Sequence, residues 1–434
     1  MRSVCAWSVR HRPHVGGELA VSTNAERGVR LPPQGHQRGN DMRFGRARGS
    51  KLPLLAVVVL TALFASSCST LMIDEMVISS DAMQGRNNLT PGSISAQNYL
   101  IYRLKSDAVG LNTTASGDAA FKQPFDVGTN IVAKIPGTDL ADQYVIIGAH
   151  YDHLGTSCRT ANDADHICNG ATDNGAGVTA LLSIADMIKA HGAPRRTVIL
   201  AAWDREEDDL GGSRYYTQHP LAPLAQTVAY INFDIQGSNL LPSLQNNSFA
   251  IGAETGGSTL TTQVKAAIGG GPIQTKLVSA IFGQGRSDYV NFTAVGVPNV
   301  FFSDSTGPCY HTAQDEVTVV DFWKLEQQTQ IAYRLAASLI ATDGRPTFAA
   351  PTPLVTFDDA LSLQTVTYAA VSDLGRFTAM QQTQLLSFRD SINAIVAAGA
   401  ANFGDDDVAT LIGGAATAVS ILSSGACDGF LSHH

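Results

Sequence analysis

Apolar runs alternate with amphipathic segments along the middle of the chain. Short runs rich in apolar and β-branched residues predict strands at 130–134, 143–149, 197–203, 227–233 and 297–302. Longer segments with apolar residues on one helical face predict helices at 93–105, 177–191 and 321–341. Strands that alternate with helices are typical of an α/β fold, here a mainly parallel mixed sheet with helices on both faces.

The pattern changes on both sides of this region. Residues 69–91 are expected to form a polar lead-in, and the prolines 346, 351 and 353 mark a linker. Segments rich in Ala, Leu and Gln then predict helices at 365–374, 379–398 and 406–422. We therefore expect an α/β domain over residues 68–345 and a helical C-terminal extension over residues 346–434.

The N-terminal region has a different composition. Residues 1–41 are rich in Arg, His, Gly and Pro, and we expect them to be disordered or not translated, with Met42 as the start. Residues 42–67 combine a basic stretch with an uncharged apolar run of 14 residues, which is too short for a membrane span but typical of a secretion signal. Small residues before Cys68 resemble a bacterial lipoprotein signal, and a signal anchor is the alternative. We expect an exported lipoprotein with a membrane-anchoring lipid on Cys68, in the outer membrane or cell envelope and facing the periplasm or the surface.

The charge distribution limits the partners of the body. Residues 1–67 hold ten of the 29 Lys and Arg but only three of the 38 Asp and Glu, so the remainder has 19 basic and 35 acidic residues. The net charge of that remainder is −16, which repels phosphate backbones. We expect no nucleic-acid partner.

Metal-binding residue types follow several of the predicted strands. In open α/β sheets, ligands bind beyond the carboxyl ends of the strands, so these side chains are expected to meet in one crevice. They are His150, Asp152, Glu206, Glu207 and Asp234, with Asp173 before a helix and His311 after the last strand. Imidazoles and carboxylates suit zinc, and more carboxylates than one ion needs favour two ions bridged by one of them.

Five ordered motifs resemble the di-zinc aminopeptidases, a family that includes glutamate carboxypeptidase II. The resemblance covers residues 79–343 and implies a zinc-aminopeptidase fold for the domain at 68–345. The motifs are His150-x-Asp152, Gly170-x-x-Asp173-Asn-x-x-Gly177, Glu206-Glu207, Asn232-x-Asp234 and Tyr310-His311-Thr.

The resemblance implies two Zn²⁺ per chain. Asp173 would bridge both ions, His150 and Asp234 would complete one site, and Glu207 and His311 the other.

Three further residues take roles from the resemblance without binding metal. Glu206 would be the general base that takes a proton from a water held between the zinc ions. Asp152 would orient His150, and Tyr310 would hydrogen-bond the developing oxyanion. The implied activity is an aminopeptidase acting on peptides. Alternatives are a carboxypeptidase or dipeptidase, a one-zinc glutaminyl cyclase, or a non-catalytic receptor. His153, His166 and His191 match no motif and are assigned no role.

The cysteines allow two interpretations. In an exported protein, Cys158 and Cys168 favour a disulfide across their loop, and a small structural zinc site with neighbouring histidines is the alternative. Cys309 and Cys427 remain, and a bond between them would tie the C-terminal helices to the loop that carries His311. The sequence leaves the pairing open.

Overall fold

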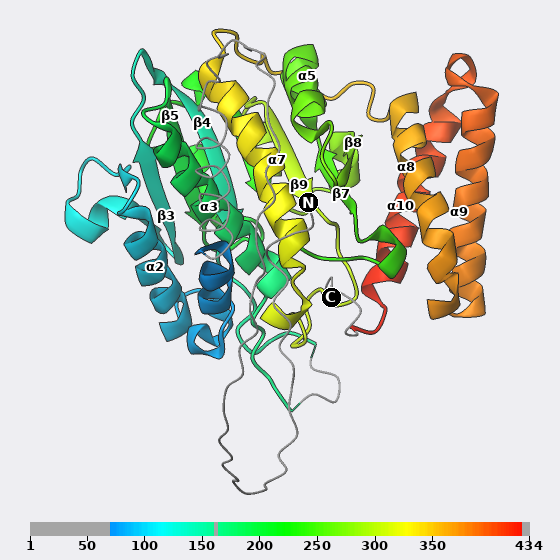
Figure 1. Cartoon of the computed structure of the whole chain (residues 1–434), viewed down its shortest axis with the longest axis horizontal. Helices are drawn as coiled ribbons and strands as arrows, with labels where there is room; N and C mark the ends of the chain where they lie inside the picture. The colour runs from blue at the N-terminus through cyan, green and yellow to red at the C-terminus, as the bar shows by residue number, and fades with distance from the viewer. Residues whose placement is uncertain (1–69, 160–163, 428–434) are drawn as a thin grey trace, which may run out of the picture. The chain divides into compact units, whose positions relative to one another are not determined.

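The computed structural model describes residues 70–159 and 164–427 (Figure 1). Within them the strands are β1 (Val109–Gly110), β2 (Lys122–Phe125), β3 (Gly128–Ile135), β4 (Leu140–His150), β5 (Arg196–Trp203), β6 (Thr227–Phe233), β7 (Asn247–Ile251), β8 (Gln274–Val278) and β9 (Asn299–Ser303). They form one nine-stranded sheet in the order β1-β3-β5-β4-β6-β9-β7-β8, and β2 pairs with β3.

The centre of the sheet is parallel. Strands β5, β4, β6 and β9 run side by side in one direction, whereas β3 is antiparallel to β5 and β7 is antiparallel to β9. Strands β5, β6 and β9 are buried along their whole length, which explains their continuous apolar sequences. The predicted mainly parallel mixed sheet is confirmed.

Helices cover both faces of the sheet, as Figure 1 shows for α2, α3, α5 and α7 on one of them. The bounds are α2 (Pro91–Leu104), α3 (Ala176–His191), α4 (Gly211–Gln218), α5 (Gly257–Ile268), α6 (Tyr289–Ala294) and α7 (Phe322–Ala341). Side chains alternate between the faces along a strand, so Leu200 of β5 packs in the core with the long helices, whereas Trp203 packs with α4 and α6.

Three further helices form the C-terminal extension. They are α8 (Phe357–Ala370), α9 (Ala379–Ala398) and α10 (Asp405–Ser423), and they share a small core that includes Phe388, Ile392 and Leu411. The prediction for α9 is confirmed at both ends. Helix α8 begins eight residues before the predicted start, because Thr356 and Asp359 form a capping box there.

The extension is fastened to the edge of the sheet beside β8 (Figure 1). The Asp359 carboxylate accepts hydrogen bonds from the backbone N–H and the hydroxyl of Ser279, both at 2.7 Å. A disulfide joins Cys309 to Cys427 just beyond α10. The C-terminal helices are therefore linked to the loop that carries His311, as the cysteine count allowed.

The segment before α2 differs from the expected polar lead-in. Residues 70–78 are helical, and the buried Asp74 accepts hydrogen bonds from Tyr99 at 2.6 Å and Arg103 at 2.7 Å. Six of the nine residues from Thr70 to Ile78 are apolar, and Asp74 is an internal partner of α2, so the expected polar lead-in is wrong over these residues.

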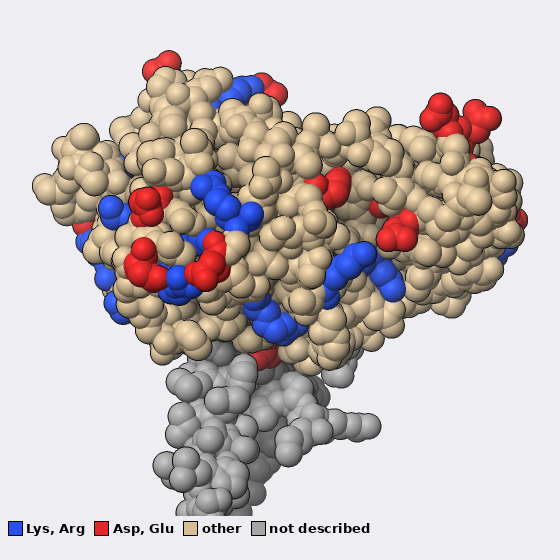
Figure 2. All heavy atoms as spheres, turned by 90° about the horizontal axis from the view of Figure 1, so that it is seen from above, with Lys and Arg blue, Asp and Glu red and all other residues tan. Residues whose placement is uncertain are grey.

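On the face shown in Figure 2, charged side chains are sparse and both signs are interspersed, in line with a charged fraction of 15%. Among the described residues, none of the helices has both the length and the apolar character to cross a membrane. The predicted disordered or untranslated residues 1–41, the predicted signal sequence and Cys68 lie outside the described residues.

Candidate metal centre

Four neighbouring parallel strands carry the candidate ligands to one edge of the sheet. His150 is the last residue of β4, Glu206 and Glu207 follow β5, Asp234 follows β6, and His311 lies in the loop after β9. Because the four strands are parallel, their carboxyl ends lie together, and the side chains converge as the sequence predicts.

Asp173 stands between two groups of ligands. Its Oδ1 lies 3.3 Å from His150 Nε2, and its Oδ2 lies 3.4 Å from His311 Nε2. Asp234 Oδ1 is 3.5 Å from the same His150 nitrogen, and Glu207 Oε2 is 3.0 Å from the same His311 nitrogen. Each oxygen of Asp173 thus faces one histidine, as in a bridging carboxylate.

Three of the four separations, at 3.3–3.5 Å, fit metal ligation better than direct hydrogen bonding, whereas the Glu207–His311 pair at 3.0 Å is within hydrogen-bonding distance. Ligand atoms about 2.0–2.2 Å from a tetrahedral zinc lie about 3.3–3.6 Å from one another. Within the part of the chain that the structure describes, His150 Nε2, Asp173 Oδ2 and His311 Nε2 are buried and have no hydrogen-bond partner. A cation at each group would satisfy these atoms, so the residues present fit two zinc ions.

The electrostatics of the centre also favour cations. Burial by itself lowers the pKa of His150, but the carboxylates of Glu206 and Asp234 outweigh it and raise that pKa well above its usual value. Burial raises the pKa of Glu206 well above its usual value, and the neighbouring carboxylates of Asp234 and Glu207 raise it further. Several carboxylates gathered in a buried site require compensating positive charge.

Glu206 lies near His150, but farther from it than Asp173 and Asp234 do. Its Oε2 is 3.9 Å from His150 Nε2, farther away than the oxygens of Asp173 and Asp234. Glu206 still belongs with His150 and Asp234 to one group of possible ligand atoms. The longer distance supports the predicted separation of a base from the ligands.

Asp152 holds both His150 and the glutamate loop. Its Oδ1 lies 3.5 Å from His150 Nδ1 and accepts the Glu206 N–H at 3.1 Å. Its Oδ2 accepts the Glu207 N–H at 3.3 Å. The predicted orienting residue therefore also fixes the loop after β5.

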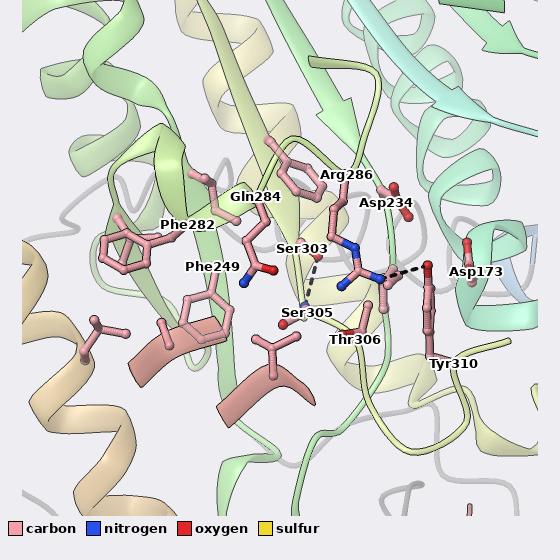
Figure 3. A pocket seen from close by; sticks show the side chains of 18 of the residues that line it. Asp173, Asp234, Phe249, Phe282, Gln284, Arg286, Ser303, Ser305, Thr306 and Tyr310 are labelled. Atoms are coloured by element: carbon pink, nitrogen blue, oxygen red, sulfur yellow. Dashed lines mark hydrogen bonds between the residues drawn. The ribbon is translucent and has the colours of Figure 1, made fainter. Parts of the chain in front are cut away.

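Tyr310 lies at the mouth of the centre. Its ring stacks on His311 with centroids 3.8 Å apart, and its hydroxyl accepts a hydrogen bond from Arg286 Nη2 at 3.3 Å (Figure 3). Burial, together with the charges of Asp173 and Glu207, raises the pKa of Tyr310. The hydroxyl therefore keeps its proton and can donate it to a hydrogen bond.

His153 is a site residue to which the sequence analysis assigned no role. Its side chain is buried, and its Nδ1 lies 2.6 Å from Glu207 Oε1, while His311 lies on the other oxygen of the same carboxylate. Burial and Asp173 raise the pKa of Glu207, but the two histidines outweigh them and lower it to about 2. The available signal was the position of His153 directly after the His150-x-Asp152 motif.

Two other buried residues support the loops of the centre, and no motif indicated how. Arg86 donates hydrogen bonds to four carbonyl oxygens at 2.6–2.8 Å, including those of Tyr151 and Gly170. Asp315 accepts the Asp173 N–H at 3.0 Å. The backbones that carry His150 and Asp173 are therefore held from behind the site.

A disulfide joins Cys158 to Cys168 in the loop beside the centre. The favoured interpretation is confirmed, and the alternative of a structural zinc site on these thiols is wrong. Arg159, next to Cys158, donates its N–H to the carbonyl of His311 at 2.9 Å. The cross-linked loop thus supports the segment that carries His311.

Comparisons with known proteins agree with this geometry. Residues 130–336 match peptidase family M28. The chain is 32% identical over 204 residues to probable glutamate carboxypeptidase LAMP1 of Arabidopsis thaliana, over 44% of this chain and 28% of the plant protein. The chain thus spans less than a third of that relative's length.

Solved structures share the fold. The LapA aminopeptidase of Legionella pneumophila has a TM-score of 0.52 at 17% identity, over 71% of this chain and 81% of that one. The glutaminyl cyclase of Porphyromonas gingivalis also has a TM-score of 0.52, at 19% identity, over 62% of this chain and 98% of that one. Because both kinds of enzyme share the architecture equally, the fold does not separate their activities.

Proposed function

Because residues 130–336 of this chain belong to peptidase family M28, we propose that the protein is a di-zinc aminopeptidase that removes N-terminal residues from peptides. The observation that carries the proposal is the placement of Asp173 between His150 and His311, with one carboxylate oxygen toward each. Asp234 and Glu207 complete the two groups. Zinc ions bound there would polarise a scissile carbonyl and lower the pKa of a water.

The side chains around this centre can move the protons that amide hydrolysis requires. Glu206 takes a proton from the attacking water and passes it to the leaving amine. Tyr310 donates a hydrogen bond to the carbonyl oxygen as negative charge develops on it. Asp152 holds the His150 ring and the Glu206 backbone in position for these steps.

The lining of the adjoining pocket supports an N-terminal substrate. Asp173, Glu206 and Asp234 line one end of the pocket (Figure 3). The rest combines apolar side chains with polar ones, namely Gln284, Arg286, Ser303, Ser305, Thr306 and Tyr310. Glu206, which is assigned no zinc ion, can attract the cationic α-amino group of a peptide, and the apolar part of the lining can accept its first side chain.

The test compares free and N-acetylated peptides with one leaving group, together with metal analysis. We expect hydrolysis of free N-termini only, two zinc ions per chain, and loss of activity to a chelator with recovery on zinc addition. Preference for the acetylated peptides would overturn the aminopeptidase, and full activity with one zinc would point to a glutaminyl cyclase.

A carboxypeptidase or dipeptidase is the second candidate, because a positively charged side chain, that of Arg286, lines the same pocket. Arg286 is exposed there and donates to Tyr310, so its guanidinium could bind the carboxylate of a short substrate. Under this alternative, Arg286→Gln raises KM for peptides with a free C-terminus and leaves KM for C-terminal amides unchanged. Equal effects on both substrates would exclude it.

We also propose that the protein is an exported lipoprotein of the cell envelope, because residues 42–68 carry a basic stretch, an apolar run and small residues before Cys68. Labelled fatty acid should appear in the wild-type protein, and Cys68→Ser should release it from membranes. Soluble wild-type protein with an N-terminus other than residue 68 would contradict the anchor.

A further inference from the structure

A pocket with both apolar and polar lining runs from the metal centre toward the C-terminal extension. At the metal end it is lined by carboxylates, and farther away by side chains of β7, β8 and β9, namely Phe249, Ile251, Val278 and Phe301. Figure 3 shows Phe249 and Phe282 at the end opposite Asp173 and Asp234. A substrate with its scissile carbonyl at the centre would extend an apolar group in this direction.

The far wall of the pocket belongs to the extension rather than to the sheet. Leu363 of α8 and Ala415 and Val419 of α10 line the same space as Asp173 and Glu206. Residues as far apart in the sequence as Asp173 and Val419, which are separated by 246 positions, therefore face one cavity. Without α8 and α10 this side of the pocket would be open.

A second apolar pocket adjoins the first inside the extension. Five residues line both pockets, namely Phe249, Ser305, Leu363, Ala415 and Val419. The remaining walls of the second pocket are largely aliphatic and aromatic, and include Leu240, Leu244, Val366, Leu374, Phe377 and Leu422. The two pockets therefore adjoin at these five side chains, and mainly apolar lining lies on both sides of that boundary.

Several bonds hold this wall against the centre. The hydroxyl of Ser423, the last residue of α10, lies 2.9 Å from Thr306 Oγ1. The backbone carbonyl of Ser423 accepts a hydrogen bond from the Arg159 side chain at 3.1 Å. The Cys309–Cys427 disulfide joins the residue before Tyr310 to the segment after α10. The wall and the loop with Tyr310 and His311 are therefore one connected structure.

We propose that the helical extension completes the acyl-side pocket, and that the preferred substrates carry a long, unbranched apolar group next to the scissile carbonyl. This inference rests on the proposed aminopeptidase activity and names its substrate class. Each methylene buried in the two pockets should raise kcat/KM about three- to fourfold, since burying one contributes about 0.8 kcal/mol. The gain should continue beyond the length of Leu or Phe, until the second pocket is filled.

The test uses 2-amino acyl amides with one fluorogenic leaving group and straight side chains from one to ten carbons. In the wild-type enzyme we expect kcat/KM to rise with chain length to at least eight carbons. Ala415→Trp fills the junction of the pockets and should lower the ratio of kcat/KM for the ten-carbon over the two-carbon substrate at least tenfold. Ala409→Trp places the same residue at an exposed position of the same helix and should keep the wild-type profile.

Every outcome of this experiment is informative. A plateau at three or four carbons, or an equal profile for the two Trp variants, would overturn the long-substrate inference while leaving the aminopeptidase intact. Failure to hydrolyse even the shortest free-amine substrate, with two zinc ions bound, would instead overturn the proposed function. If Ala415→Trp does not fold, the smaller Ala415→Leu should shift the optimum toward shorter chains, and an unshifted optimum would refute the inference.

Discussion

Replacing Glu206 by Gln separates the roles of two adjacent glutamates. Glu206 Oε2 lies 3.9 Å from His150 Nε2, whereas both oxygens of Glu207 lie within 3.0 Å of a histidine nitrogen. Gln keeps the size and the carbonyl oxygen of Glu but cannot take up a proton. At position 206 we therefore expect the fold and both zinc ions to survive and the chemistry to fail.

The magnitude follows from the role of the base. General-base catalysis contributes about 10²–10⁴-fold, so kcat should fall by that factor with little change in KM. This corresponds to about 2.7–5.4 kcal/mol added to the activation barrier. Glu207→Gln turns one of two histidine-facing oxygens into an NH₂ group, so zinc should bind at least about tenfold more weakly there.

The assay measures kcat, KM and zinc per chain for wild type, Glu206→Gln and Glu207→Gln, with thermal unfolding as the control for folding. The expected pattern is two zinc ions with slow turnover for the first variant, and loss of zinc with loss of turnover for the second. Near-normal turnover of Glu206→Gln, or zinc loss equal to that of Glu207→Gln, would show that the roles are misassigned.

Other perturbations test the structure around the centre. Asp173→Ala should abolish binding of both zinc ions rather than one, as measured by metal analysis, because its two oxygens face both groups. Arg86→Met should lower the free energy of unfolding in urea by at least about 3 kcal/mol, since each buried acceptor left without its donor costs about 1–3 kcal/mol. Cys427→Ser opens a link across 118 residues and should cost about 2–4 kcal/mol in the same assay, without loss of zinc. Burial raises the pKa of Glu75 to about 7, so its contribution to stability is present below pH 4.5 and is lost as pH rises through 7. Glu75→Gln should flatten that part of the unfolding profile, and an unchanged profile would contradict the assignment.

The sequence predicted much of the fold because the central strands are buried, and burial requires the apolar composition that makes a strand recognisable. Strands β5 and β6 are buried on both faces, so their composition is almost entirely apolar and their bounds were predicted within one residue. Strand β8 is half-exposed and short, with the sequence Gln-Thr-Lys-Leu-Val, and carries no such signal. The helix at 70–78 was not predicted, although six of its nine residues are apolar, since the polar residues that follow it up to position 91 dominate the composition of the segment.

The same distinction applies to the site. Motif order predicted His150, Asp173, Glu207, Asp234 and His311 as ligands, and the structure brings them together because parallel strands place their carboxyl ends at one edge of the sheet. The sequence by itself therefore determined the fold class and the candidate chemistry. Only the tertiary structure decided which atoms face each other and that His153 lies on Glu207. It alone also showed that residues of α8 and α10 line the pocket beside the metal centre. These are contacts between segments far apart in the chain, and their geometry depends on packing that no local pattern encodes.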